Sequence, residues 1–272
     1  MMSGIKLMGN GMIIHILTTL IIAAGLALPA SAKENKGRAI AKKSIEINQG
    51  FGGQTSTMVM KIKEKNGEIV TRIMSMISKE QDGGQKNLLV IDKPADVSGT
   101  KLLTWSYTGT KLQWLYLPSF KKIKKVAGTG RYGSFMGSEF SYEDLLTPSL
   151  DDYTYQYLSE KMVAKKKTWL VKRLPKNLEN TQYSKHLVYF DQKTYQPLKI
   201  EFFNQKKKKF KIAYFVNFKG YRKKGQSKKF WLADTFSMKN VLTGRSSSIT
   251  WKQRTLGADI DDDDLDKSSL ED

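Results

Sequence analysis

Residues 56–78 read STMVMKIKEKNGEIVTRIMSMIS, and this stretch decides the fold class. Met58, Met60 and Ile62 recur at every second position, which places their side chains on one face of a β-strand. Asn66-Gly67 is a strong signal for a hairpin turn, and residues 68–78 follow it as the returning strand. The sequence therefore predicts a β-hairpin with a methionine-rich apolar face.

Similar strand patterns continue along the chain, separated by turns rich in Gly, Asn, Asp, Pro or lysine. The predicted strands are 86–92, 100–107, 112–117, 121–126, 152–158, 167–174, 184–191, 197–203, 210–218, 230–238 and 248–253. A short amphipathic helix is expected before all of them, over residues 37–47. Because no helices alternate with the strands, a parallel α/β sheet is excluded. The sequence predicts a mainly antiparallel β fold that curls into a barrel or a half-open, incomplete barrel.

Several of these strands are apolar on both faces. Leu112, Trp114 and Tyr116 share one face of their strand, whereas Leu115 and Leu117 share the other. An antiparallel sheet with one face in water should alternate cleanly, so something must cover each face here. Either a helix packs on one side, or one side lines an apolar cavity.

The methionines of the first hairpin favour the cavity. Met58, Met60, Met74 and Met76 all lie in this hairpin. Methionine is flexible and polarizable, and it suits surfaces that accept variable apolar partners. Ordinary core packing is the alternative explanation for the same residues.

The first residues set the expected compartment. Lys6 precedes an apolar run from Ile13 to Leu28, and Ala30-Ser31-Ala32 provides a signal-peptidase site, so cleavage before Lys33 is expected. An uncleaved membrane anchor is the alternative, but the run is short for a spanning helix. The predicted organisation is a signal peptide over 1–32, one β domain over 33–258 and an acidic, flexible tail over 259–272.

Charge and cysteine usage narrow the class of partner. The formal net charge is +20 and cysteine is absent, which excludes disulfides, thiolate nucleophiles and N-terminal lipid attachment. We expect a soluble monomer in the periplasm, without a lipid anchor. Export argues against nucleic acid, which leaves anionic headgroups or an acidic protein as partners. Solvated lysines on exposed strand faces are the alternative explanation of the charge.

Catalytic and metal-binding patterns are weak. His186 is the one histidine beyond the expected cleavage site, and no G-x-S-x-G motif is present. A calcium loop counted from Asp259 would place Asp264 at the glycine position and Leu270 at the bidentate position, so it is rejected. The sequence predicts a protein that is not an enzyme and that needs no metal or cofactor.

Residues 135–145, FMGSEFSYEDL, form a compact loop after the lysine-rich strand 121–126. The S-x-x-D pattern of Ser141 to Asp144 predicts one helical turn. Phe135, Met136 and Phe140 give the segment an apolar side. It is therefore predicted to be a short helical lid or plug over the barrel mouth.

The carboxylates of this loop have two possible roles. Glu139, Glu143 and Asp144 could bond to backbone or to lysines at the rim. They could instead be the acids of a hydrolase acting on lipid or glycan, although nothing else in the sequence supports that chemistry.

Four segments carry a resemblance to a known family: DKPADVSGTKLLTW (92–105), QWLYLPSFKKIKKV (113–126), SFMGSEFSYEDL (134–145) and FSMKNVLTGRSSSITW (236–251). They resemble the outer-membrane lipoprotein-sorting protein family, in the LolA/LolB-like superfamily of periplasmic lipoprotein carriers. The resemblance extends over about residues 36–265. It implies a half-open antiparallel barrel with a helical lid and an apolar cavity for acyl chains.

The resemblance also implies a function and a set of partners. The chain would be a periplasmic carrier or chaperone that takes lipoprotein or lipid acyl chains toward the outer membrane. Its partners would be an inner-membrane transporter of the RND/MMPL type or an ABC-type release complex, and an outer-membrane acceptor. The alternative is an accessory subunit of an RND-type exporter, in which the barrel is an interaction module.

Two groups of candidate site residues follow. The cavity and lid candidates are Met58, Met60, Ile62, Met74, Met76, Trp105, Trp114, Tyr116, Phe135, Met136 and Phe140. The candidates for contact with a headgroup or partner are Lys121, Lys122, Lys124 and Lys125.

Overall fold

The computed structural model describes residues 29–271 and consists of one helix, one sheet and short 3-10 turns. The helix is α1 (Ala30–Glu46). The strands are β1 (Gly53–Lys63), β2 (Ile69–Gln81), β3 (Gly84–Lys93), β4 (Lys101–Tyr107), β5 (Thr110–Leu117), β6 (Lys122–Lys125), β7 (Tyr153–Val163), β8 (Lys166–Pro175), β9 (Tyr183–Asp191), β10 (Pro197–Asn204), β11 (Lys209–Arg222), β12 (Lys229–Asn240) and β13 (Ser246–Leu256). The expected signal sequence, apart from its last residues, lies outside the described residues.

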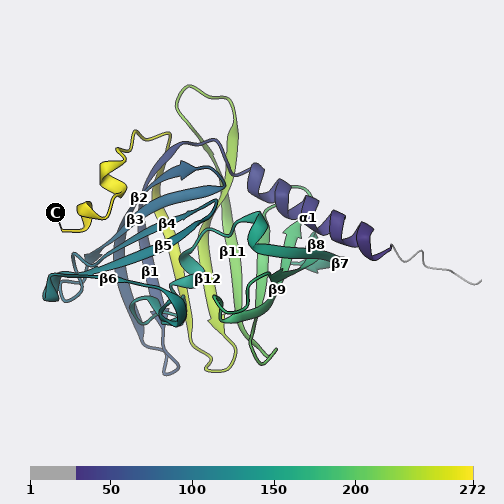
Figure 1. Ribbon diagram of the computed structural model, residues 1–272, viewed down its shortest axis with the longest axis horizontal. Helices are drawn as coiled ribbons and strands as arrows, with labels where there is room; N and C mark the ends of the chain where they lie inside the picture. The colour runs from purple at the N-terminus through teal and green to yellow at the C-terminus, as the bar shows by residue number, and fades with distance from the viewer. Residues whose placement is uncertain (1–28, 272) are drawn as a thin grey trace, which may run out of the picture.

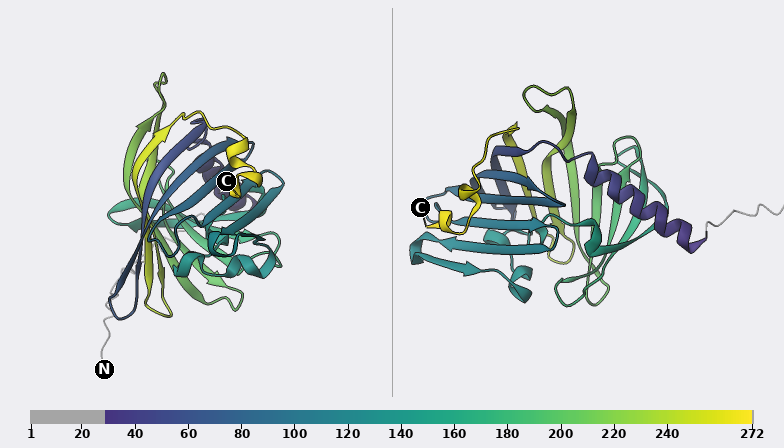
Figure 2. Two further views of the ribbon diagram at one scale, coloured as in Figure 1. Left: turned by 90° about the vertical axis from the view of Figure 1, so that its left-hand side faces the viewer. Right: turned by 45° about the horizontal axis from the view of Figure 1, so that its top comes forward.

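All thirteen strands belong to one antiparallel sheet in the order β6-β5-β4-β3-β2-β1-β13-β12-β11-β10-β9-β8-β7. The sheet curls strongly, but its edge strands β6 and β7 do not pair, so the barrel stays open (Figures 1 and 2). This confirms the predicted half-open antiparallel barrel with an N-terminal helix. Each predicted strand is present within a few residues of its expected position.

The first hairpin forms as its pattern predicts. Met58 of β1 pairs with Met74 of β2, and both side chains are almost fully buried. Gly67 takes a positive φ of 91° in the turn, a conformation that glycine adopts without steric cost. The two-residue alternation therefore places the methionine face inside the curl.

The chain crosses the opening between the two sheet edges only once within residues 29–271. Residues 126–152 connect β6 to β7, which are the opposite edges of the sheet, through four short 3-10 turns. Phe135 and Phe140 of this crossing segment are fully buried in the main core, and Phe140 packs on Phe236 of β12 with 4.8 Å between ring centroids. The short helical lid expected from the sequence corresponds to this segment, which the two phenylalanines fix to the sheet.

Helix α1 begins earlier than its apolar pattern indicates. It was expected over residues 37–47, but it starts at Ala30, directly after Pro29. Residues 30–36 are mostly Ala, Lys and Glu, which form helix readily without an apolar stripe. No helix within residues 29–271 is long and apolar enough to cross a membrane.

A glycine allows α1 to approach the sheet closely. A Cβ atom on Gly37 would lie only 2.7 Å from the backbone nitrogen of Tyr157 in β7. Ile40 and Ala41 then join the main apolar core. The helix therefore covers the β7 end of the sheet (Figure 1).

The acidic segment at the C-terminus corrects a prediction. It was expected to be flexible, but Ile260, Leu265 and Leu270 are buried against the outer face of β3 to β5. Trp105 donates a hydrogen bond from Nε1 to the carbonyl of Leu265 at 2.8 Å. The segment lies beside these strands in both views of Figure 2. Acidity alone suggested a solvated tail, whereas three apolar residues at a spacing of five bind it to the sheet.

Candidate functional site

A cavity of about 960 Å³ lies between the inner face of the sheet and the crossing segment. Its volume falls within the range of about 300–1,000 Å³ that is typical of ligand pockets. Apolar residues of eight strands line much of its wall: Met58, Met76, Leu89, Leu102, Ile200, Phe202, Phe215, Phe236, Ile249 and Trp251. A hydrocarbon chain placed against this wall would be removed from water.

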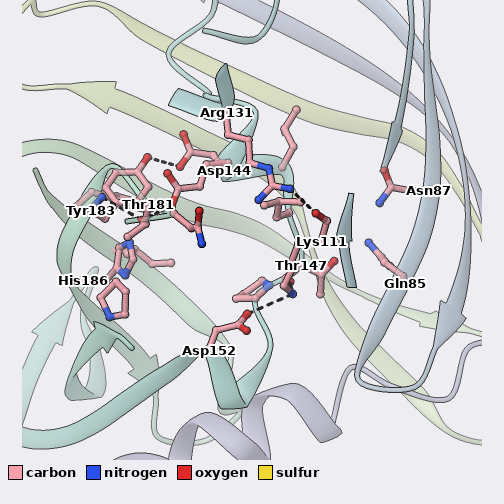
Figure 3. Close-up of a pocket in the computed structure, with 18 of the residues that line it drawn as sticks. Gln85, Asn87, Lys111, Arg131, Asp144, Thr147, Asp152, Thr181, Tyr183 and His186 are labelled. Atoms are coloured by element: carbon pink, nitrogen blue, oxygen red, sulfur yellow. Dashed lines mark hydrogen bonds and ion pairs between the residues drawn. The ribbon is translucent and has the colours of Figure 1, made fainter. Parts of the chain in front are cut away.

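Another part of the wall is polar, and many of its side chains are drawn in Figure 3. Lys111 and Arg131 extend into the cavity, and Asp152 bonds to Lys111 Nζ at 3.3 Å. Lys111 Nζ also donates to the carbonyl of Thr147 at 2.8 Å. These contacts attach β5 to the last turns of the crossing segment, so the same residues line the cavity and fix its cover.

Asp144 is the centre of a buried hydrogen-bond network at this wall. Its Oδ2 accepts from the backbone N–H of Ser141 and from the Ser141 hydroxyl, both at 2.8 Å. Lys211 Nζ lies 3.2 Å from the same oxygen, and the Tyr183 hydroxyl donates to Oδ1. The predicted S-x-x-D turn therefore forms, and its aspartate also ties the crossing segment to β9 and β11.

Glu143 and Glu139 have different surroundings. Glu143 accepts hydrogen bonds from the Thr181 hydroxyl and from the backbone N–H of Gln182. Glu139 is buried away from the main cavity and lies 3.1 Å from Arg245. Each carboxylate of the crossing segment thus has protein donors of its own, as expected for the structural role considered above.

Burial shifts the ionisation of this wall. It lowers the pKa of Lys111, although Asp152 opposes the shift. It also lowers the pKa of Arg131 and raises the pKa of Glu143. His186 is fully enclosed, and burial followed by the charge of Arg173 holds its pKa well below the usual value. The cavity is therefore an environment in which ionic groups have lost much of their hydration.

His186 packs rather than pairs with a nucleophile. Its Nδ1 accepts a hydrogen bond from Arg173 Nε at 3.3 Å, and its ring lies 5.0 Å from that of Phe202. The Ser141 hydroxyl bonds instead to Asp144. Within residues 29–271, no group of three or more His, Cys, Asp or Glu is placed to hold a metal ion.

The structure brings part of the predicted apolar site together. Met58 and Met76 line the cavity. Met60, Ile62 and Met74 are buried in the adjoining core, as are Phe135 and Phe140, with Met136 packed partly buried beside them. This second set packs in the core beside the cavity and is not among the residues that line it.

Three aromatic residues lie on the opposite face from the one expected. Trp105, Trp114 and Tyr116 pack under the C-terminal segment in a separate apolar cluster. Trp105 and Trp114 contact each other edge to face at 5.0 Å. Their assignment to the cavity is wrong, because both faces of β4 and β5 are apolar and the pattern does not say which face points inward.

The lysines of β6 remain on the surface. Lys122, Lys124 and Lys125 of β6 are exposed at the edge of the sheet, as is Lys121 just before it, and Lys125 also lines the cavity. Lysines on an edge strand also prevent it from pairing with another chain. A contact of these residues with a headgroup or partner stays a prediction.

Sequence reasoning missed the polar wall itself. Lys111, Arg131, Arg173, Tyr183 and His186 come from distant parts of the chain. One signal was present: Lys111 and Gln113 alternate with Leu112 and Trp114, so they share the face of Leu115. Gln113 is fully buried and the Lys111 side chain is 24% exposed, and a buried polar residue on an apolar strand indicates an inward polar site.

Comparison with protein-family models identifies a family over most of this chain. A family model described as an uncharacterized protein matches residues 83–272. A comparison with curated proteins finds no match.

Comparison with solved structures identifies relatives over nearly the whole chain. An outer membrane lipoprotein-sorting protein domain from Vibrio parahaemolyticus is 32% identical, with a TM-score of 0.82 over 88% of this chain and 100% of that one. A DUF1329 family protein from Desulfovibrio piger is 25% identical, with a TM-score of 0.81 over 88% of this chain and 99% of that one. A LolA superfamily protein from Nitrosomonas europaea is 17% identical, with a TM-score of 0.67 over 86% and 98%, and it shows the shared fold alone.

Proposed function

Because this chain belongs to the outer-membrane lipoprotein-sorting protein family and has the LolA-like fold, we propose that it is a periplasmic carrier. In this role it binds acyl chains of lipoproteins or lipids in its cavity and moves them toward the outer membrane. The cavity of about 960 Å³, with its apolar wall, is the observation that carries the proposal. The activity is reversible binding, without covalent chemistry.

The energetics of transport explain why such a wall is needed. Exposing an acyl chain to water costs about 0.8 kcal/mol per CH₂ group, which is on the order of 10 kcal/mol for a membrane-length chain. The carrier must offset most of this free energy by burial. It must not bind much more tightly, because the cargo then would not be released. Flexible Met58 and Met76 in the wall suit a cavity that accepts and releases chains.

A carrier also needs a donor and an acceptor. We infer an inner-membrane transporter of the RND/MMPL type or an ABC-type release complex as donor, and an outer-membrane acceptor. The exposed lysines Lys121, Lys122 and Lys124 support a contact with anionic headgroups, at about 1 kcal/mol for each cation near such a surface. An anionic membrane surface is compatible with the formal net charge of +20.

Titration with a fluorescent fatty acid tests the proposal. Met76→Trp puts a large ring at a half-buried position of β2 that lines the cavity. Ile69→Trp makes the same kind of change at an exposed position of the same strand. We expect the first variant to weaken probe binding at least tenfold and the second to leave it unchanged, with both proteins folded by circular dichroism.

The contrary results are also clear. If the unmodified protein binds no probe and retains no extractable lipid from its host, the carrier role is rejected. Equal binding by the two variants and the unmodified protein would place the probe outside the cavity, and would reject the cavity as the site.

A further inference from the structure

The carboxylates of the cavity wall have partners within the protein, whereas several cations of the same wall make no ion pair among the described residues. Each wall carboxylate has a donor from the protein itself. Glu143 is bonded by Thr181 and Gln182, and Asp144 by Ser141, Tyr183 and Lys211. The remaining two pairs are Asp151 with Arg38 at 2.7 Å and Asp152 with Lys111 at 3.3 Å. The anionic acceptors of the wall are therefore already occupied.

Most of the cations that line the cavity lack an ion-pair partner in the described chain. Within residues 29–271, four cations of the wall make no ion pair with a carboxylate: Lys125, Arg131, Arg173 and Lys176. The cavity thus combines carboxylates that already accept hydrogen bonds or ion pairs from the protein with four cations that make no ion pair within these residues, of which Arg131 also interacts with the charge of Glu143. Its wall is complementary to an anion and not to a cation.

Among these four cations, Arg131 has a guanidinium nitrogen that is buried without a hydrogen-bond acceptor from residues 29–271. Its Nη2 donates to the backbone carbonyl of Lys111. Its Nε is shielded from solvent and has no hydrogen-bond partner among the described residues. Arginine stays protonated in proteins, and a buried donor without an acceptor is unfavourable. In Figure 3 the guanidinium reaches into the cavity beside Lys111. Its Nη1 bonds to none of residues 29–271 and is not among the shielded atoms, so a bound anion would supply an acceptor to Nη1.

Arg173 contributes a second guanidinium to the same cavity. Its Nε donates to Nδ1 of His186 at 3.3 Å, and its central carbon lies 4.4 Å from the ring centroid of Tyr153. The two partners are neutral, so they orient the group without cancelling its charge. Its Nη donors make no other hydrogen bond among residues 29–271.

We propose that the cavity binds amphiphiles with an anionic headgroup, held by Arg131 with Arg173, while the acyl chain lies along the apolar wall. This inference rests on the carrier function proposed above and specifies its cargo. Guanidinium groups bind carboxylate and phosphate through paired, charge-assisted hydrogen bonds. A headgroup of either kind satisfies the donors, whereas a neutral or cationic headgroup leaves them without an acceptor.

Competition between ligands of equal chain length tests the headgroup. The uncharged probe N-phenyl-1-naphthylamine is bound first and is then displaced at pH 8 by one of four C14 amphiphiles below their aggregation limits. These are myristate, myristyl phosphate, monomyristoylglycerol and tetradecyltrimethylammonium. We expect the two anions to displace the probe at concentrations at least tenfold lower than the neutral lipid, and the cation to be the weakest. The carboxylate and phosphate arms distinguish the two sources of anion.

Variants assign the preference to residues. Arg131→Gln should remove most of the anion preference and leave displacement by monomyristoylglycerol unchanged, while Arg131→Lys should retain part of it. Arg173→Gln should reduce the preference further when combined with Arg131→Gln. Arg222→Gln, at an exposed site on β11, is the matched control and should bind like the unmodified protein.

The possible outcomes separate the headgroup inference from the carrier function and from the assignment to the two arginines. Equal displacement by all four amphiphiles, or strongest displacement by the cation, overturns the headgroup inference and leaves the carrier function standing. If neither probe nor amphiphile binds, both proposals fail. An anion preference that persists in the double variant, or equal weakening of neutral and anionic ligands by Arg131→Gln in a protein that remains folded, overturns the assignment to these arginines.

Discussion

At the scale of single residues, Asp144 and Lys211 form one of two deeply buried ion pairs among residues 29–271, the other being Arg254 with Asp234. The side chains of Asp144 and Lys211 are 2% and 8% exposed, and they lie 3.2 Å apart. A charge left alone in such a place cannot be hydrated. Most other ion pairs here are on the surface, where a pair contributes little. The buried pair of Asp144 and Lys211 therefore fixes the crossing segment to β11.

Removing one partner of this pair should be strongly destabilising. Asp144→Ala leaves Lys211 buried and unpaired, so we expect the free energy of unfolding to fall by about 3–5 kcal/mol in urea denaturation. Lys209→Met is the control, because Lys209 is 42% exposed and Glu201 keeps Lys199 at 2.6 Å. The control should change stability by less than about 1 kcal/mol. Equal effects of the two variants would contradict this account.

Glu143 should make stability depend on pH. Burial raises its pKa above the usual 4.5, against opposing hydrogen bonds from Thr181 and Gln182. Between the unfolded and the folded pKa, the native state binds more protons, so this residue makes stability fall as pH rises. Glu143→Gln should remove that slope. We expect its melting temperature, relative to that of the unmodified protein, to be highest at pH 7–8, to decline as pH falls toward 4.5, and to level off below 4.5. A difference that is independent of pH would be contrary to the assignment.

At the scale of elements, helix α1 depends on the space left by one glycine. Alanine normally stabilises a helix relative to glycine by about 1 kcal/mol. At Gly37 a methyl group would meet the backbone of β7 at 2.7 Å, and backbone cannot move aside cheaply. The steric effect should therefore outweigh the gain in helix propensity.

Gly37→Ala should destabilise the protein by about 1–3 kcal/mol, the usual range for overpacking. Gly130→Ala is a suitable control, since no atom lies within 4 Å of its added Cβ. Thermal unfolding of both variants measures the difference. A stabilising Gly37→Ala would mean that α1 does not lie this close to β7.

The C-terminal segment is held mainly by apolar side chains. Its ion pair between Lys79 and Asp262 is largely exposed at 3.0 Å, whereas Leu265 and Leu270 are fully buried. Burial of a leucine contributes about 1.5–3 kcal/mol, more than an exposed pair. High salt should therefore leave the segment in place.

Leu265→Ala should release the segment, because a buried leucine lost to alanine costs about 2–5 kcal/mol. Lys267 is already exposed, and release would free the backbone around it to enter the active site of trypsin and would speed amide exchange of residues 260–270. Asp263→Ala, at an exposed position of the same turn, should change neither. Unaltered proteolysis of the leucine variant would show that other contacts hold the segment.

Local sequence patterns predict the strands and the first hairpin, but they do not predict how distant segments pack together. The strands follow from alternation, and the hairpin at Gly67 follows from its turn residues, because both depend on neighbours in the chain. The docking of Leu265 under Trp105 links residues 160 positions apart. Acidic composition concealed it, since a charge count ignores three well-spaced apolar residues.

At the scale of the whole molecule, the cavity results from the sheet's long-range order. The chain leaves one edge at β6 and reaches the other at β7, so residues 126–152 must cross the opening. The apolar wall was partly predictable from Met58 and Met76. The polar wall was not, because Arg131 and Arg173 come to line one cavity only after the curl of the sheet is set, and no local pattern encodes that curl.

The central claim is that an acyl chain lies inside the curl, and photo-crosslinking with a fatty acid that carries a terminal diazirine tests it most directly. We expect peptide mapping by mass spectrometry to find the label on inner-wall residues such as Met76, Leu89, Leu102 or Ile249. Excess unlabelled fatty acid should abolish these adducts. Labelling confined to the outer face around Trp105 and Trp114, or to no defined site, would contradict the claim.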